Sequence, residues 1–216
     1  MLLVGFEAYG GRGVNPAAEI SKVMDGETIA GTKVSAAVLP VNFNGMTERL
    51  DALIERYSPS ALICLGLWPG EPMIRLERFG VNLNDFEIPD NEGTVTHGPI
   101  EPDGPAARGA TLPLERIRET LLKAGIPARL SSSAGNFLCN ALLFGALGLL
   151  ERRGTAIPCG FIHLPYMPEQ VAAMLNDLMS GQNLELHQRA DLASMPLELS
   201  TRAVRLAIET TLDDVA

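Results

Sequence analysis

The 216-residue sequence predicts an α/β fold, a three-layer α/β/α sandwich around a mostly parallel central sheet. Short apolar runs, typical of buried strands, alternate with longer segments of helical spacing, and this alternation is typical of βαβ units. No internal repeat and no change of composition marks a boundary. We therefore expect residues 1–216 to form one α/β domain of ordinary size.

The first half of the chain sets the pattern. An apolar run over 1–4, followed by Gly, predicts a buried strand. Asn15-Pro16 supplies an N-cap and an N1 proline for a helix over 17–24. A Val- and Ala-rich strand over 33–41 follows, and apolar residues at helical spacing then predict a helix over 46–57.

The alternation continues to the end of the chain. Residues 61–65 read as a buried strand and 74–83 as a longer extended segment. A helix over 114–124 ends at the stop signals Gly125 and Pro127. The remaining strands are expected over 128–130 and 157–164, and the remaining helices over 141–150, 168–179 and 197–211.

One segment interrupts this scheme. Five Pro and four Gly residues lie between 87 and 113, which excludes a sustained helix or a central strand there. We expect a long Pro/Gly-rich excursion. Such a segment is usually a lid, a binding loop or a subunit contact, and a solvated loop without a function is the alternative.

Composition excludes several function classes. Seventeen Lys and Arg residues against 26 Asp and Glu give a net charge of −9, with no basic cluster. This argues against nucleic-acid partners and against an anionic membrane surface. Three cysteines form no disulfide framework, which favours a reducing compartment. The amino terminus has no basic segment before its apolar run, so no signal peptide is expected and the predicted location is cytoplasmic.

Cys139 is the candidate nucleophile. It follows a predicted strand and a small-residue turn, and the apolar run over 141–150 begins two residues later. A thiol in the first turn of a helix meets the positive end of the helix dipole, which lowers thiol pKa values to about 3.5–7.5. A buried, inert cysteine is the alternative, and it is our reading of Cys64 and Cys159, which lie in apolar strands.

His163 is the candidate base. A cysteine nucleophile normally needs a histidine and a third group that orients the imidazole. His97 lies in the Pro/Gly-rich segment and His187 in a polar segment, where both can be surface residues. His163 instead falls at the carboxyl end of a predicted strand, where α/β sheets gather their active sites. A buried core histidine remains the alternative.

Glu77 is the candidate orienting acid. It stands in an extended apolar context, where an unpaired carboxylate is costly. A structural salt bridge to Arg75 or Arg78 is the competing explanation, and spacing alone favours it. No His or Cys spacing typical of a metal site is present, and no intact phosphate-binding loop is found.

A series of motifs occurs in order along nearly the whole chain, and together they resemble the pyroglutamyl peptidase I (pyrrolidone carboxyl peptidase) family. The motifs are Gly5–Gly11, Asn15-Pro16, Leu39–Val41, Gly66, Glu77-Arg78 with Asn82, Ile88–Gly93, Asp103–Ala107, Thr111–Pro113, Ser133–Asn140 and Gly160–Gln170.

The resemblance implies a cysteine exopeptidase that removes an N-terminal pyroglutamyl residue from peptides through a thioester, without metal or cofactor. Cys139 would be the nucleophile, His163 the base and Glu77 the acid that orients it. Family members are cytoplasmic and often form dimers or tetramers, so a homo-oligomer is expected. The residues expected to bind substrate are Phe6, Tyr9, Asn15, Leu67, Phe137 and Leu138; for Phe6, plain core packing is the alternative.

Several positions depart from the family pattern. Ala8-Tyr9 replaces the usual Pro-Phe, and Leu67-Trp68 replaces a Gln and a small residue. Glu87 stands where an Arg is usual. The resemblance places that Arg near the oxyanion site. Loss of one oxyanion donor costs about 10²–10³ in rate, and a carboxylate at this position would also oppose the negative charge of the oxyanion.

Arg75 is also unusual, because it replaces a small polar residue. We hypothesise that Arg75 supplies the missing cation or neutralises Glu87. These departures keep two alternatives open: a thiol hydrolase of another lactam or small amide, and a non-catalytic binding protein on the same scaffold.

Overall fold

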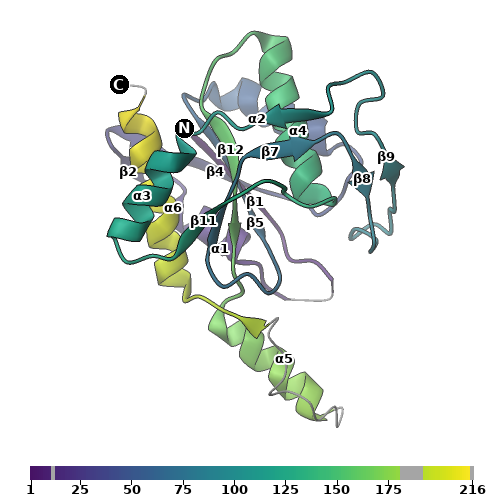
Figure 1. Ribbon diagram of the computed structural model, residues 1–216, viewed down its shortest axis with the longest axis vertical. Coiled ribbons are helices and arrows are strands. Elements are labelled where there is room, and N and C mark those ends of the chain that lie inside the picture. Colours follow the sequence, from purple (N-terminus) through teal and green to yellow (C-terminus); the bar gives the residue numbers. More distant parts are fainter. Residues whose placement is uncertain (11–12, 181–191, 215–216) are drawn as a thin grey trace.

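A computed structural model describes residues 1–10, 13–180 and 192–214 (Figure 1). Its helices are α1 (Pro16–Met24), α2 (Met46–Tyr57), α3 (Leu114–Lys123), α4 (Leu138–Arg153), α5 (Pro168–Ser180) and α6 (Leu197–Asp213). Its strands are β1 (Leu2–Phe6), β2 (Thr28–Ile29), β3 (Thr32–Lys33), β4 (Ser35–Leu39), β5 (Leu62–Leu67), β6 (Ile74–Glu77), β7 (Phe79–Val81), β8 (Asn84–Asp85), β9 (His97–Gly98), β10 (Ala107–Gly109), β11 (Ala128–Ser131) and β12 (Cys159–Leu164).

The central sheet has six strands in the order β11-β6-β12-β5-β1-β4. Strands β4, β1, β5 and β12 run parallel, whereas β6 is antiparallel to β12 and parallel to β11. Only residues 68–73 join β5 to β6. A parallel return needs a crossover of a dozen or more residues, so this short connection reverses the direction of β6. The mostly parallel sheet predicted from the sequence is confirmed.

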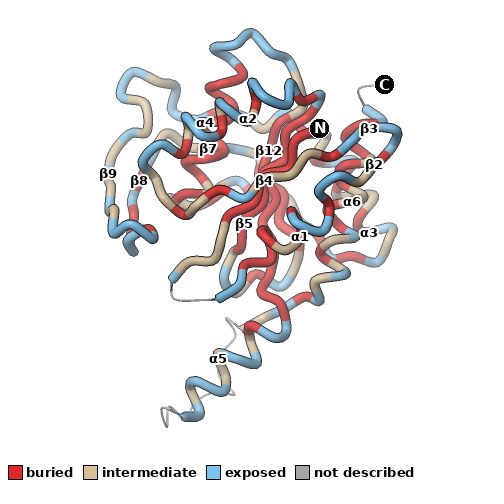
Figure 2. The backbone as a smooth tube through the Cα atoms, turned by 180° about the vertical axis from the view of Figure 1, so that it is seen from behind, coloured by how far each residue is buried: buried red, intermediate tan, exposed pale blue. Residues whose placement is uncertain are grey.

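Helices cover both faces of the sheet, which gives the three predicted layers (Figure 1). Helices α1, α3 and α6 pack on one face in an apolar core that includes Ile20, Ile117 and Ile208. Helices α2 and α4 pack on the other face, where Leu50 and Leu143 are fully buried. Figure 2 shows the sheet as a buried centre between two more exposed outer layers.

Helix α1 begins as its sequence predicts. Asn15 has extended backbone angles, its side chain accepts a hydrogen bond from the Ala17 N–H, and Pro16 occupies the first helical position. The amide of Asn15 also donates to the Glu7 carbonyl at 2.8 Å, which ties the helix start to the segment after β1. The residues that follow β1 are therefore held close to α1.

The segment 87–113 is not a continuous structureless excursion. Strand β9 pairs with β8, and β10 pairs with β7, both antiparallel and both outside the central sheet. The Pro and Gly residues thus exclude a central strand, as expected, but leave room for short peripheral pairs. Glu87 lies two residues after β8, with Phe86 between them.

Helix α5 extends away from the body of the molecule (Figure 1), and Gln170 is the one residue of this helix that is buried. Among the residues placed by the structure, no helix combines the length and the apolar character needed to cross a membrane.

Candidate active site

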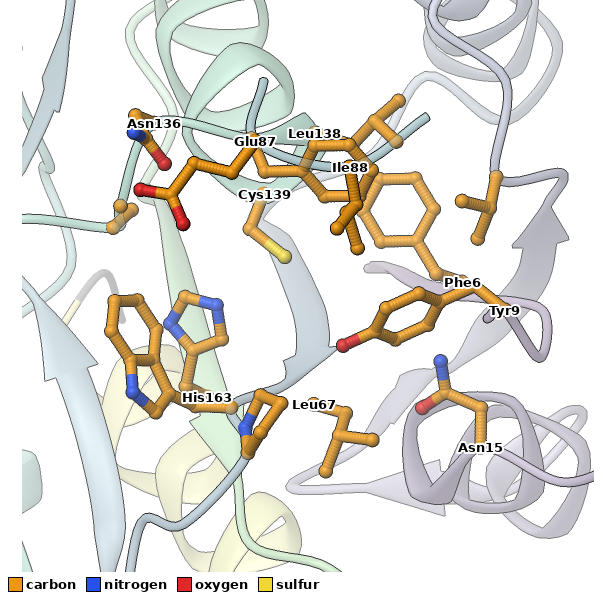
Figure 3. A pocket seen from close by; sticks show the side chains of 16 residues that line it. Phe6, Tyr9, Asn15, Leu67, Glu87, Ile88, Asn136, Leu138, Cys139 and His163 are labelled. Carbon is orange, nitrogen blue, oxygen red and sulfur yellow. The ribbon is translucent and has the colours of Figure 1, made fainter. Parts of the chain in front are cut away.

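A pocket of about 240 Å³ opens where β1, β5 and β12 end and α4 begins (Figure 3). Most of its lining is apolar. It is lined by Phe6, Tyr9, Asn15, Val41, Leu67, Trp68, Pro69, Glu87, Ile88, Ala134, Gly135, Asn136, Phe137, Leu138, Cys139 and His163. The structure thus brings Cys139, His163 and all six residues expected to bind substrate to one cavity.

Cys139 lies in the first turn of α4 and projects toward the sheet. Its Sγ sits over Gly66 of β5, where a Cβ added to that glycine would lie 2.8 Å from the sulfur. Gly66 is the register partner of His163 on the adjacent strand β12. Because neighbouring strands lie about 4.8 Å apart, this position sets the sulfur beside the strand that carries the imidazole.

His163 is held on its far side by Glu77. Its Nδ1 lies 2.8 Å from Oε1 of Glu77, and the residue is 1% exposed. Because an ionised carboxylate only accepts hydrogen bonds, Nδ1 carries the proton and Nε2 is left as the acceptor. The Trp68 ring meets the imidazole edge-on, with centroids 4.9 Å apart. No hydrogen bond joins Sγ of Cys139 to this ring within the described ranges.

Glu77 makes both contacts that its sequence context suggested. It is fully buried, and its Oε1 accepts from His163 and also from Nε of Arg75, at 2.6 Å. The other candidate partner, Arg78, pairs instead with Glu115. Burial acts to raise the pKa of Glu77, but the hydrogen bond from His163 and the charge of Arg75 leave that pKa below its ordinary value.

The pKa of the Cys139 thiol differs from the one expected from the sequence. Burial raises the pKa of Cys139 to about 12, and the negative charge of Glu77 acts in the same direction. Burial also lowers the pKa of His163, against the opposing effect of Glu77. The expected low thiol pKa is therefore wrong for the free protein, because desolvation of the sulfur outweighs its place in the helix. The resting pair is a thiol and a neutral imidazole.

Arg75 lies behind the imidazole in a buried charged network. Besides Glu77, it contacts Oε2 of Glu71 at 3.5 Å and donates to the Ser133 carbonyl at 2.6 Å. Its guanidinium also lies 3.7 Å from the centroid of the Trp68 ring. Arg75 does not line the pocket, and none of its ion pairs in the described chain involves Glu87. Its contacts fit a positioning role behind the site.

The start of α4 is left uncapped. No side chain caps this helix and no acidic residue stands in its first turn. Its first backbone N–H groups therefore have no partner within the helix, and Leu138 and Cys139 both line the pocket. Such groups attract a negatively charged atom, because they also form the positive end of the helix dipole.

Asn140 is a structural residue for which the sequence suggested no role. It is fully buried and exchanges hydrogen bonds of 2.8 and 2.9 Å with the Val81 backbone. Its amide also donates to the Leu83 carbonyl at 2.9 Å. It thereby fastens the residue after Cys139 to β7. An Asn within the first turn of an otherwise apolar helix was the available signal.

Of the other residues considered in the sequence, some line the pocket and some lie outside it. The side chain of Asn15 lines the cavity but is committed to the α1 cap and to Glu7. Tyr9 directs its hydroxyl into the cavity (Figure 3). His97 is exposed and pairs with Asp85 outside the pocket lining, whereas His187 lies outside the described residues. Cys64 and Cys159 are buried in the core, as expected.

The chain is similar to known proteins over its whole length. The model of the pyroglutamyl peptidase family matches residues 1–214. A pyrrolidone-carboxylate peptidase of Pyrococcus furiosus is 38% identical over 216 residues, covering 100% of this chain and 99% of that protein. One from Bacillus cereus is 36% identical over 212 residues, with coverages of 98% and 92%.

Solved structures give the same result. The crystal structure of pyrrolidone carboxyl peptidase from Pyrococcus furiosus superposes with a TM-score of 0.90 at 38% identity, over 100% of this chain and 99% of that one. A mutant of that enzyme gives a TM-score of 0.91 at 37% identity, with the same coverages. This chain therefore belongs to the pyroglutamyl peptidase family.

Proposed function

We propose that this protein is a cysteine peptidase that hydrolyses the amide bond after an N-terminal pyroglutamyl residue of a peptide. The full-length family match supports this activity. The observation that carries it is one cavity that holds a helix-start thiol and an imidazole fixed by a buried carboxylate. Neither alternative considered for the sequence is favoured by the comparisons.

In this proposal Cys139 is the nucleophile and His163 the general base. Because the free thiol is protonated, proton transfer to Nε2 of His163 accompanies attack of sulfur on the pyroglutamyl carbonyl carbon. A rotation of the Cys139 side chain in the substrate complex completes the hydrogen bond to His163, since catalytic contacts often tighten only in that complex. Glu77 fixes the tautomer and stabilises the imidazolium that forms.

The remaining steps follow from acyl transfer. The carbonyl oxygen becomes an oxyanion, which the free N–H groups at the start of α4 stabilise. His163 then gives its proton to the departing amine as the C–N bond breaks, leaving a thioester on Cys139. Water, deprotonated by the same histidine, attacks the thioester and releases pyroglutamate and the thiol.

The lactam ring is proposed to lie on the apolar side of the pocket. Phe6 and Leu67 are buried there, and Phe137 packs against Phe86, with ring centroids 4.5 Å apart. A neutral five-membered ring suits apolar walls and a few polar contacts. Phe6, Tyr9, Leu67, Phe137 and Leu138 supply the walls, and Asn15 holds Tyr9's segment in place through its capping contacts.

Hydrolysis of a pyroglutamyl chromogenic amide tests the function. We expect the wild type to cleave this amide and Cys139→Ala to lose the activity. Cys159→Ala should stay near wild-type activity, because Cys159 is buried and does not line the pocket. If no pyroglutamyl amide is cleaved but a lactam protects Cys139 from alkylation, a different substrate or a binding role replaces this proposal.

Location and assembly are further proposals. A cytoplasmic location is supported by three free cysteines.

A homo-oligomer is supported by α5, which projects from the body with half-buried apolar side chains such as Leu175 and Leu178. The whole of 1–216 is proposed to act as one catalytic unit. Light scattering coupled to size exclusion measures the assembly directly; a monomer at micromolar concentration rules out the oligomer.

A further inference from the structure

The pocket has two unlike sides around the sulfur of Cys139 (Figure 3). Phe6, Tyr9 and Leu67 lie on one side, and His163 and Glu87 lie on the other. If the lactam occupies the apolar side, the leaving amine faces His163, which must protonate it. The residue that follows pyroglutamate in the substrate then lies beside Glu87.

Glu87 is the one acidic side chain among the residues that line the cavity, and no Lys or Arg lines the described pocket. Its carboxylate points into the cavity next to Asn136 (Figure 3). No ion pair within the described part of the chain engages it. An unpaired carboxylate at the mouth of an apolar pocket attracts a cation, because low-dielectric walls focus its field.

The carboxylate is presented by ordered backbone rather than by a free loop. The N–H of Asp85 donates to the Asn136 carbonyl at 3.0 Å, and that of Phe86 donates to the Thr96 carbonyl at 3.1 Å. Phe86 is 2% exposed and packs edge-on against the rings of Phe43 and Phe137. The residue before Glu87 is thus anchored in the core, which fixes the direction of the next side chain.

We propose that Glu87 is a specificity residue that selects substrates with a cationic side chain directly after the pyroglutamyl residue. This inference rests on the proposed function and adds to it the class of preferred substrate. The net charge of −9 favours the approach of the same peptides at long range. A pyroglutamyl-arginyl or pyroglutamyl-lysyl peptide is the substrate class that this charge recognises.

The test compares pyroglutamyl-arginine amide with pyroglutamyl-citrulline amide, which has nearly the same shape but no charge. Partly exposed ion pairs contribute up to about 1 kcal/mol, so we expect wild-type kcat/KM to favour arginine by about fivefold at low salt, and less at high salt. In Glu87→Gln the ratio falls to about one while citrulline amide is still cleaved. Glu92→Gln, an exposed change on the same segment outside the pocket lining, keeps the wild-type ratio.

The outcomes are distinct. Equal rates on the two amides in the wild type, or an arginine preference that survives Glu87→Gln, overturn the role of Glu87 and leave the proposed function intact. Glu87→Arg should reverse the selection, so that pyroglutamyl-glutamate amide is cleaved faster than pyroglutamyl-glutamine amide. If the wild type cleaves none of these amides, the proposed function itself fails and the specificity role is withdrawn with it.

Discussion

Replacing Glu77 by Gln tests whether this carboxylate orients the imidazole or only neutralises a buried arginine. Both explanations fit the contacts, because one oxygen accepts from His163 at 2.8 Å and from Arg75 at 2.6 Å. The side chain is fully buried, so water cannot replace it. The amide keeps the size of the carboxylate but removes the charge and presents an N–H₂ group, which cannot accept from either neighbour.

The expected loss of stability follows from these contacts. Removing one partner of a buried ion pair costs about 3–5 kcal/mol. Arg75 keeps Glu71 and the Ser133 carbonyl, so we expect the lower end, about 3 kcal/mol, or a fall in Tm of about 6–12 °C for a chain of this size. Glu115→Gln, which removes only exposed pairs with Arg78 and Arg118, should change Tm by no more than about 4 °C.

The acid dependence of stability should change as well. The folded-state pKa of Glu77 lies below its ordinary value of 4.5. Its contribution to stability is therefore present above that value and is lost as the pH falls through the folded-state pKa. In Glu77→Gln this part of the acid dependence disappears, so the variant loses stability less steeply than the wild type on acidification below about pH 5.

Activity decides between the two explanations. In serine peptidases the corresponding loss of charge lowers kcat about 10⁴-fold, because the imidazole takes the wrong tautomer. We expect about 10³–10⁴ here, measured as kcat on a pyroglutamyl amide. The double variant Glu77→Gln/Arg75→Met removes the unpaired arginine, so stability should recover in part while kcat does not. Recovery of kcat to within about tenfold of wild type would refute the orienting role.

Three further predictions concern the surroundings of the thiol. Gly66→Ala places a Cβ 2.8 Å from Sγ of Cys139, so kcat/KM should fall at least about 100-fold. The control Gly109→Ala, where the nearest atom to the added Cβ is 3.9 Å away, should stay close to wild type, and an active Gly66→Ala would contradict the placement of the sulfur. Asn140→Ala removes three buried hydrogen bonds and should lower the free energy of unfolding in urea by about 2–4 kcal/mol; a change under about 1 kcal/mol sinks this role. Because burial raises the pKa of Cys139 to about 12, its alkylation by iodoacetamide should keep accelerating up to about pH 10, and a plateau below about pH 8 would reveal a preformed thiolate.

Local patterns predicted most of the fold. Helix α2 covers Met46–Tyr57, the range given by its apolar spacing, and α1 begins at the predicted Asn15-Pro16 cap. The direction of β6 could not be read from its own residues, because it depends on the short connection after β5 and on β12 lying between the two strands. Strand direction is therefore a property of the topology that the segment alone does not carry.

The site was predictable in its chemistry but not in its contacts. A helix-start cysteine and a strand-end histidine carry recognisable sequence signals, and both line the cavity. In the network of Arg75, Ser133 and Trp68, the contact between Arg75 and Ser133 spans 58 positions, so no local sequence pattern predicts it. The thiol pKa was misjudged because helix position is visible in sequence, whereas burial of the sulfur depends on the packed pocket.

The most direct test of the account is to trap the acyl-enzyme. Wild type mixed with a pyroglutamyl ester or amide and quenched in acid during turnover should carry one pyroglutamyl group, and peptide mapping should place it on Cys139. The adduct should be absent in Cys139→Ala. An adduct on any other residue, or rapid turnover without a covalent intermediate at any time after mixing, would contradict nucleophilic attack by this sulfur.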